Sequence, residues 1–80
     1  MAVSNEILDY IRQKADEHGV DPNVALGVIE HESGFDPKAV NKQSGVTGLG
    51  QLMPNTAEAY GATDVKDWGQ NVDASVQLLS

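Results

Sequence analysis

Residues 30–37 are Glu30-His31-Glu32-Ser33-Gly34-Phe35-Asp36-Pro37, and residues 48–54 are Gly48-Leu49-Gly50-Gln51-Leu52-Met53-Pro54. The first stretch puts a carboxylate at the end of an apolar run, and Gly34 and Pro37 stop that run as they stop helices. The second stretch is a glycine-rich turn that carries Gln51 and Met53. Together they predict a helix that ends in an acid, followed shortly by a polar turn.

The helix before the acid is predicted to span Asn23 to Ser33. Asp21 can accept a hydrogen bond from the first free amides, and Pro22 fits the first helical turn. At about 100° per residue, one stripe of core-facing width contains Ala25, Val28, Ile29 and Glu32. We therefore expect Glu32 to prolong the buried face of this helix.

A carboxyl group at the edge of an apolar face is partly desolvated, which disfavours its charged form and lets it give up a proton. Cleavage of a glycosidic bond needs such a general acid, because the departing oxygen must be protonated. The alternative is structural: a Glu at a helix end often pairs with a lysine or a backbone amide. Glu30 points to a different side, since residues two apart on a helix do not face each other.

The two stretches resemble motifs of one enzyme family, the soluble lytic transglycosylases. Residues 31–37 resemble the Glu-Ser motif with its following aromatic residue and Asn/Asp-Pro, and residues 45–57 resemble the second motif. The order and the spacing of the motifs also match. Weaker similarity runs from about Ile7 through Asn71 to Leu79, so the resemblance covers most of the chain.

The resemblance implies a small, mostly α, lysozyme-like helical domain, related to the goose-type lysozymes, over residues 1–80. It also implies cleavage of the β-1,4 bond between N-acetylmuramic acid and N-acetylglucosamine in peptidoglycan, with a 1,6-anhydromuramic product end. Glu32 matches the catalytic acid, and Ser33 matches the residue that orients this acid or contacts sugar. Gly48, Gln51 and Met53 match positions that bind substrate, and no cofactor or metal is implied.

A second catalytic carboxylate is not evident in the sequence. Glycosidases usually use two acids on either side of the bond, yet Glu30 faces elsewhere. Asp36 stands before Pro37, where it more plausibly braces the turn through its own backbone. We expect the C6 hydroxyl and the N-acetyl group of the substrate to take the role of the second carboxylate.

Two departures from the family pattern carry expectations of their own. Gly50 stands where the family commonly has Met, which is expected to remove a side chain from the groove wall and to loosen the turn. The third motif, an Ala-Tyr-Asn-like segment after the helix that begins near Asn71, is missing, and neither Tyr10 nor Tyr60 is a substitute. We expect a domain without the usual C-terminal part, as in a fragment of a larger domain or protein.

The other elements are also predicted to be helical. A first helix has Ser4 as its N-cap and ends at Gly19, with its apolar positions at Ile7, Leu8, Ile11 and Ala15. A short helix opens on a capping box formed by Asn55 and Glu58 and closes at Gly61. Residues 62–69 are a polar linker, in which Asp64 and Asp67 are surface or capping residues. The last helix is marked by Val72, Val76 and Leu79.

Single side chains suggest further roles. Trp68 fits a core plug better than a sugar-stacking platform. His31 lies beside Glu32, but His18 is the only other histidine and the spacing is not that of a zinc site. The chain has no cysteine, which excludes disulfides and thiolate metal sites.

The net charge of −7 argues against nucleic acid and anionic membrane surfaces as partners. Because peptidoglycan itself carries carboxylates, Lys38 and Lys42 between the motifs are the most useful nearby cations. The alternative is that they are ordinary solvated surface lysines, which exposed single lysines usually are. No signal region or bilayer-length apolar run is visible. We expect a place of action in the cell envelope, periplasm or cell wall, or in a phage virion, with other domains of a parent protein as partners.

Three functions remain open at this stage. The first is a lytic transglycosylase, and the second is a lysozyme-like muramidase that uses water to complete the reaction. The third is a non-catalytic module that binds or assembles peptidoglycan. Product chemistry separates the first two, and binding without any product would establish the third.

Overall fold

The computed structural model describes residues 3–80, and four helices make up most of this part of the chain. They are α1 (Asn5–Glu17), α2 (Pro22–Ser33), α3 (Pro54–Ala59) and α4 (Trp68–Leu79). Within these residues, β structure is limited to two isolated bridges. The mostly α fold class predicted from the sequence is confirmed.

Helix α2 begins and ends where its local signals predict. The Asp21 side chain accepts a hydrogen bond from the Asn23 amide at 2.9 Å, and Pro22 occupies the first turn. Gly34 ends the helix in the left-handed conformation, with a φ of 63° that glycine adopts without a steric cost. These signals are contained in a few adjacent residues, which is why the sequence alone located them.

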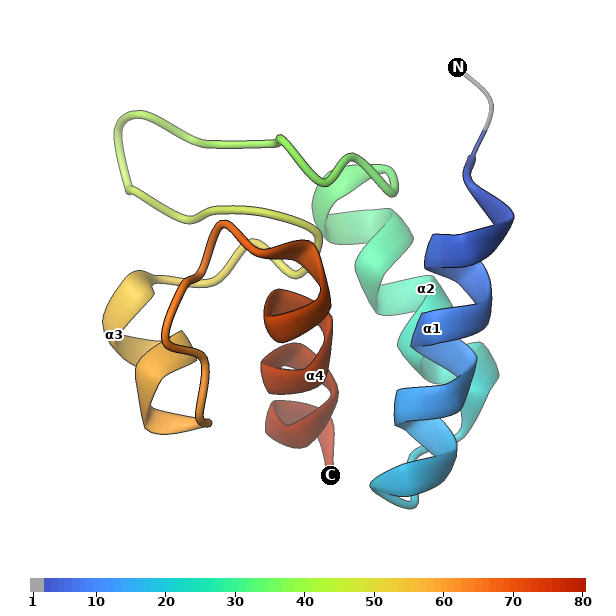
Figure 1. The fold of residues 1–80 in the computed structure, drawn as a ribbon. Coiled ribbons are helices and arrows are strands. Elements are labelled where there is room, and N and C mark those ends of the chain that lie inside the picture. Colours follow the sequence, from blue (N-terminus) through green and yellow to red (C-terminus); the bar gives the residue numbers. More distant parts are fainter. Residues whose placement is uncertain (1–2) are drawn as a thin grey trace.

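One helix organises the core. Helix α1 packs against both α2 and α4, and α3 contacts α4 (Figure 1). The main buried cluster takes residues from these three longer helices and from the loop after α2: Ile7, Ile11, Ala15, Ala25, Ile29, Leu49, Val72 and Val76. A smaller cluster joins α3 to α4 through Leu52, Ala57, Ala62 and Ala74. Helix α4 therefore contributes to both clusters.

The long loop from α2 to α3, residues 34–53, arches over the upper left of Figure 1 and is held mainly by backbone hydrogen bonds. Thr47 and Leu52 exchange two of these bonds, at 2.9 and 3.0 Å, and the Gly48 amide donates to the Ala39 carbonyl at 2.7 Å. Thr47 also forms a bridge with Val40. The loop is thus a compact folded unit that carries the second motif.

Ser4 is the N-cap of α1 as predicted, although its side chain makes no capping hydrogen bond. The other two predicted helix starts need correction. Helix α3 starts at Pro54 rather than at a capping box, and the Asn55 side chain accepts from the next amide instead. Helix α4 starts at Trp68, because Asp67 caps it by accepting from the Gly69 amide at 3.1 Å. The capping role predicted for Asp67 is therefore confirmed.

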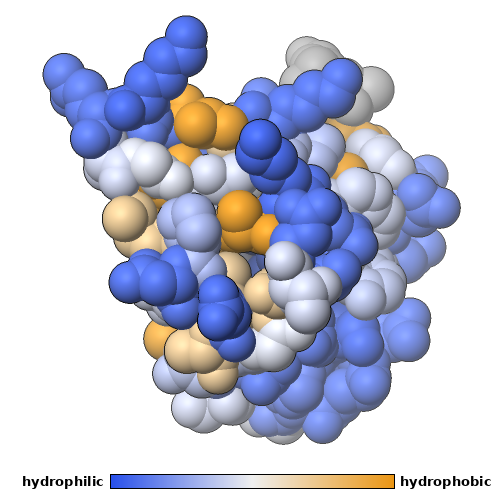
Figure 2. All heavy atoms as spheres, turned by 60° about the vertical axis from the view of Figure 1, so that its left-hand side comes forward, coloured by the Kyte–Doolittle hydropathy of each residue, from blue (hydrophilic) through white to orange (hydrophobic). Residues whose placement is uncertain are grey.

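Figure 2 shows small hydrophobic patches separated by hydrophilic residues on the face that carries α3. The end of α4 is less buried than predicted, since Leu79 is exposed although Val72 and Val76 are fully buried. In the part of the chain that the structure describes, none of the helices is both long enough and apolar enough to cross a membrane.

Candidate functional site

Glu32 lies in the last turn of α2 and is exposed, so the prediction that it prolongs the buried face is wrong. Ala25 and Ile29, earlier on the same side of the helix, are fully buried. The helical period fixes the direction of a side chain, but burial also needs a neighbouring element at the same height along the helix. The residues that cover Ala25 and Ile29 stop short of Glu32. Glu30 and His31 are exposed as well.

Ser33, the neighbour of the candidate acid, is half-buried and turned back onto its own helix. Its hydroxyl donates to the Ile29 carbonyl at 3.1 Å. The oxygen keeps its capacity to accept a hydrogen bond from another group. Within residues 3–80 the side chains of Ser33 and Glu32 share no hydrogen bond.

The chain turns sharply directly after Ser33. Gly34 and Phe35 both have positive φ angles, 63° and 62°, and this conformation is uncommon for an aromatic residue. Phe35 is half-buried against the main core cluster. Asp36 then accepts a hydrogen bond from the Lys38 amide at 2.9 Å, which confirms the prediction that Asp36 braces this turn.

Gln51 holds the loop of the second motif together. Its Nε2 donates to the carbonyls of Ala39 and Gly48, each at 2.9 Å, and its own backbone has a φ of 52°. Both amide hydrogens are therefore used. The Oε1 atom makes no hydrogen bond within the described chain, so it can accept one from a ligand.

Asn71 is the residue that the sequence interpretation missed. Its side chain is fully buried and ties two segments, the loop after α2 and the stretch before α4, to α4. Oδ1 accepts from the Gly50 amide at 2.8 Å, and Nδ2 donates to the carbonyls of Thr47 at 2.9 Å and Val65 at 3.0 Å. A signal was present, since Asn71 stands one residue before Val72 on the buried side of an amphipathic helix, where a polar residue needs partners.

Gly50 faces α4, so the prediction that its lack of a side chain opens the groove wall and loosens the turn is wrong. A Cβ atom placed on Gly50 would lie 1.8 Å from Ser75 Oγ and 2.7 Å from Ser75 Cβ. A Cβ on Gly48 would lie 2.5 Å from Asn71 Nδ2, and Gly48 also has a φ of 79°. Both glycines are needed because the loop backbone touches α4.

Met53 stands at the other end of the loop as the N-cap residue of α3 and is 40% exposed. Its thioether is accessible, as a contact surface for a ligand requires. The structure brings Gly48 and Gln51 into direct contact, because both the backbone and the side-chain amide of Gln51 donate to the Gly48 carbonyl. Within residues 3–80 no side-chain hydrogen bond or ion pair joins Glu32 or Ser33 to this loop. The one backbone link in that part of the chain is the Asp36 amide, which donates to the Ser33 carbonyl at 3.2 Å.

The residues that could hold a metal ion do not gather in one place. Among the residues that the structure describes, no three His, Cys, Asp or Glu side chains form a group able to hold an ion. His31 is exposed at the end of α2, and His18 lies beyond the end of α1.

The model of the transglycosylase SLT domain family matches residues 9–80. This chain belongs to the transglycosylase SLT domain family. The resemblance in the two motifs is therefore confirmed, and the match extends over α4 as well as the motifs.

Three curated relatives of this SLT domain show how widely similar segments occur. A membrane-bound lytic murein transglycosylase F of Desulfosudis oleivorans is 46% identical over 70 residues, which are 88% of this chain and 15% of the relative. A membrane-bound lytic murein transglycosylase C of Glaesserella parasuis is 32% identical, over 91% of this chain and 23% of the relative. A transglycosylase of Enterobacteria phage PRD1 is 36% identical, over 79% and 23%. The SLT domain described here thus spans less than a quarter of each of these relatives.

A polar cluster joins α1 and α4 of the SLT domain away from the loop. His18 Nε2 lies 2.8 Å from Asp73 Oδ1, Lys14 Nζ lies 3.7 Å from the same oxygen, and Gln77 donates to Asp73 Oδ2 at 3.0 Å. Partial burial raises the pKa of Asp73, but the hydrogen bonds from His18 and Gln77 and the charge of Lys14 outweigh it and hold the pKa below its ordinary value. The cluster fixes α4 relative to α1.

Tyr10 and Trp68 pack edge to face, with ring centroids 5.3 Å apart and an angle of 83° between the rings. Both side chains are half-buried against the main core cluster. The packing role predicted for Trp68 is therefore confirmed. The contact between the two rings holds the start of α4, and so Asn71, against α1.

Proposed function

We propose that this SLT domain is the catalytic unit of a peptidoglycan lytic transglycosylase. It would cleave the β-1,4 bond between N-acetylmuramic acid and N-acetylglucosamine and leave a 1,6-anhydromuramic end. Support comes from the family match over residues 9–80 and from relatives whose names describe them as lytic murein transglycosylases. The observation that carries the proposal is the pairing of an accessible Glu32 with a loop whose second motif is locked in place by Gln51 and Asn71.

Glu32 is assigned both proton transfers. In the first step it protonates the bridging oxygen as the bond from that oxygen to the anomeric carbon breaks, and positive charge develops on the muramic ring. In the second step the Glu32 carboxylate takes the proton from the C6 hydroxyl of the same sugar, whose oxygen bonds to the anomeric carbon. Glu32 ends as it began, and no water is consumed.

Because Glu32 is exposed in the free domain, the bound substrate must itself exclude water from the Glu32 carboxyl group. In the free domain the Glu32 carboxyl group contacts solvent, whereas a general acid works best when its charged form is disfavoured. A glycan strand laid along the end of α2 would displace this water. Desolvation of Glu32 would then occur only in the complex with substrate.

The loop residues are assigned to binding. Gln51 Oε1 is the hydrogen-bond acceptor for a sugar hydroxyl or amide group, and Met53 supplies an apolar contact. The Ser33 oxygen accepts a hydrogen bond from sugar or from the protonated Glu32. Gly48 allows the close approach of the loop to α4 that places Gln51 at the surface.

Mass spectrometry of products from purified peptidoglycan tests the proposal. The unmodified chain is expected to release anhydro-ended muropeptides, and Glu32→Gln is expected to release none. Glu30→Gln is the matched control, because Glu30 is an exposed acid in the same helix that points to a different side. Equal product from Glu32→Gln and from the unmodified chain would contradict the assignment.

The exposure of Glu32 also favours a second candidate, a non-catalytic module that binds peptidoglycan. Retained binding with no product from a folded chain would establish it. Solvent access at Glu32 also favours a muramidase, in which water completes the reaction. Its product would have a reducing end instead of an anhydro end.

We further propose that the domain acts in the cell envelope or in a phage particle and works beside other domains of a longer protein. The membrane-bound and phage relatives support the first point, and the small share of each relative that the chain spans supports the second. Peptidoglycan strands are the proposed partner, and the net charge of −7 disfavours nucleic acid.

A further inference from the structure

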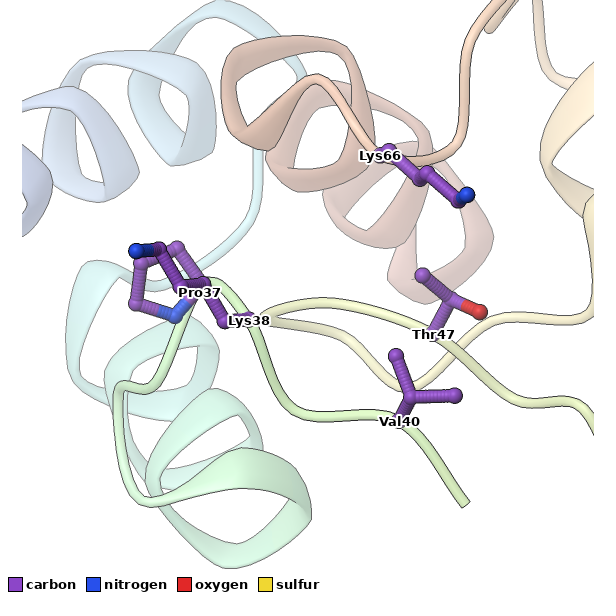
Figure 3. Close-up of a pocket in the computed structure, with 5 residues that line it drawn as sticks. All are labelled: Pro37, Lys38, Val40, Thr47 and Lys66. Carbon is purple, nitrogen blue, oxygen red and sulfur yellow. The ribbon is translucent and has the colours of Figure 1, made fainter. Parts of the chain in front are cut away.

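A hollow of about 210 Å³ lies between the segment that follows α2 and the segment that precedes α4. Figure 3 shows the residues that line it: Pro37, Lys38, Val40, Thr47 and Lys66. None of them is among the residues assigned above to proton transfer or to sugar binding.

The lining of the hollow combines apolar groups with positively charged groups. Pro37, Val40 and the lysine stems give it an apolar surface, and Val40 is 53% exposed. In Figure 3, Lys38 and Lys66 extend in opposite directions, so that their ammonium groups lie apart. The hollow therefore offers an apolar surface with two separate positive charges at its margin.

These two lysines are positive charges in a chain that has an excess of acidic residues. The sequence has five Lys and Arg residues against twelve Asp and Glu residues. Arg12 and Lys14 pair with acids, whereas Lys38, Lys42 and Lys66 form no salt bridge within residues 3–80. Of these three lysines, Lys38 and Lys66 line the hollow. Their charges are therefore free for a ligand.

The backbone of each lysine is held by an aspartate two residues earlier. The Lys38 amide donates to Asp36 Oδ1 and the Lys66 amide donates to Asp64 Oδ1, each at 2.9 Å. Each carboxylate has an oxygen committed to the turn, and neither aspartate lines the hollow. Two similar turns thus present the two lysines at the margin of the hollow.

We propose that this hollow binds the peptide stem of peptidoglycan, a short peptide that carries separated carboxylates and small methyl side chains. This inference rests on the proposed function and assigns a part of the substrate to a second site. Two separated ammonium groups match two separated carboxylates, whereas a single small anion carries its charge in one place. Small methyl groups of the stem fit against Pro37 and Val40.

Calorimetric titration with a synthetic, sugar-free stem peptide tests the inference. Each of Lys38→Gln and Lys66→Gln is expected to weaken binding about two- to fivefold, the range for one exposed ion pair, and the double variant about four- to 25-fold. Lys42→Gln is the matched control, because Lys42 is exposed in the same loop and does not line the hollow. Circular dichroism confirms that each variant is folded.

Two further titrations sharpen the result. A stem peptide with amidated carboxylates is expected to bind the unmodified chain as weakly as the free-acid peptide binds the double variant. Inorganic phosphate is expected to bind much more weakly than the peptide. Equal affinity of the double variant and Lys42→Gln for the peptide would overturn the inference, and so would phosphate binding as tight as peptide binding.

The outcome is separable from that of the catalytic proposal, because a sugar-free peptide needs no cleavage to bind. A chain that produces anhydro ends but does not bind the stem would overturn this inference alone. A chain that binds the stem through both lysines but yields no product would support this inference and contradict the catalytic proposal.

Discussion

Gly50→Ala is the substitution on which the structure and the sequence interpretation disagree most clearly. If Gly50 only left a gap in a groove wall, a methyl group there would be harmless. In the structure the new Cβ would lie 1.8 Å from Ser75 Oγ and 2.7 Å from Ser75 Cβ. Rotation can move the Ser75 hydroxyl away, but it cannot move Ser75 Cβ, so the loop must separate from α4.

The expected cost follows from two terms. Overpacking of a well-packed site costs about 1–3 kcal/mol. Separation of the loop also breaks the 2.8 Å hydrogen bond from the Gly50 amide to Asn71 Oδ1, and an unpaired buried amide costs a further ~1–3 kcal/mol. We expect Gly50→Ala to lower the free energy of unfolding by about 2–6 kcal/mol, the sum of the two terms. This is a large part of the ~4–12 kcal/mol typical for a chain of this length.

Urea unfolding followed by far-UV circular dichroism and by Trp68 fluorescence measures this loss. Gly27→Ala is the control, because Gly27 lies within α2 with no other atom within 4 Å of its added Cβ, and it is expected to stabilise by about 0.5–1 kcal/mol. Combining Gly50→Ala with Ser75→Gly should recover at least ~1 kcal/mol by double-mutant cycle. A loss below about 1 kcal/mol in Gly50→Ala alone would refute the packing argument.

The other predictions concern residues that hold or surround the site. Asn71→Ala should cost about 3–5 kcal/mol in urea unfolding because it unpairs three backbone groups, whereas the exposed Asn23→Ala should change stability by less than about 0.5 kcal/mol. Gln51→Glu removes two donated hydrogen bonds and places a carboxylate beside two carbonyls, so thermal unfolding should show a loss of about 1–3 kcal/mol. Because the folded pKa of Asp73 is held below 3.8, its contribution to stability is present above that pH and is lost as the pH falls through 3.8 toward the folded pKa. Unfolding measured against pH should therefore show a smaller acid-induced loss for Asp73→Asn, and an equal loss would contradict this assignment. Asp36→Asn keeps the acceptor oxygen of its turn and should leave product formation largely intact, whereas a loss of product as complete as that of Glu32→Gln would give Asp36 a catalytic role.

Local signals account for what the sequence predicted correctly. Asp21 and Gly34 bound α2 through contacts with residues close to them in the chain. Ile11, Ile29 and Val72 each belong to the apolar repeat of a different helix, and all three are fully buried. Features of this kind need only the periodicity of a helix and the chemistry of its ends.

Contacts between distant segments account for what the sequence did not reveal. Gly50 and Asn71 are separated by 21 positions, and only the packing of the loop on α4 brings them together. Comparison of the motifs therefore assigned Gly50 to the groove wall, whereas in the structure Gly50 faces α4. The prediction that Glu32 is buried was wrong because helical periodicity gives the direction of a side chain. It does not show how far along the helix the covering core extends. The sequence indicated Lys38 and Lys42 as positive charges. The hollow that Lys38 lines together with Lys66 exists only in the folded chain.

Digestion of purified peptidoglycan in heavy-oxygen water, with mass spectrometry of the muramic ends, tests the central claim most directly. The account predicts anhydro ends without heavy oxygen from the unmodified chain, because the C6 hydroxyl replaces water as the attacking group, and no product from Glu32→Gln. Reducing ends that contain heavy oxygen would contradict it and identify a hydrolase. Anhydro ends that persist in Glu32→Gln would contradict the role of Glu32.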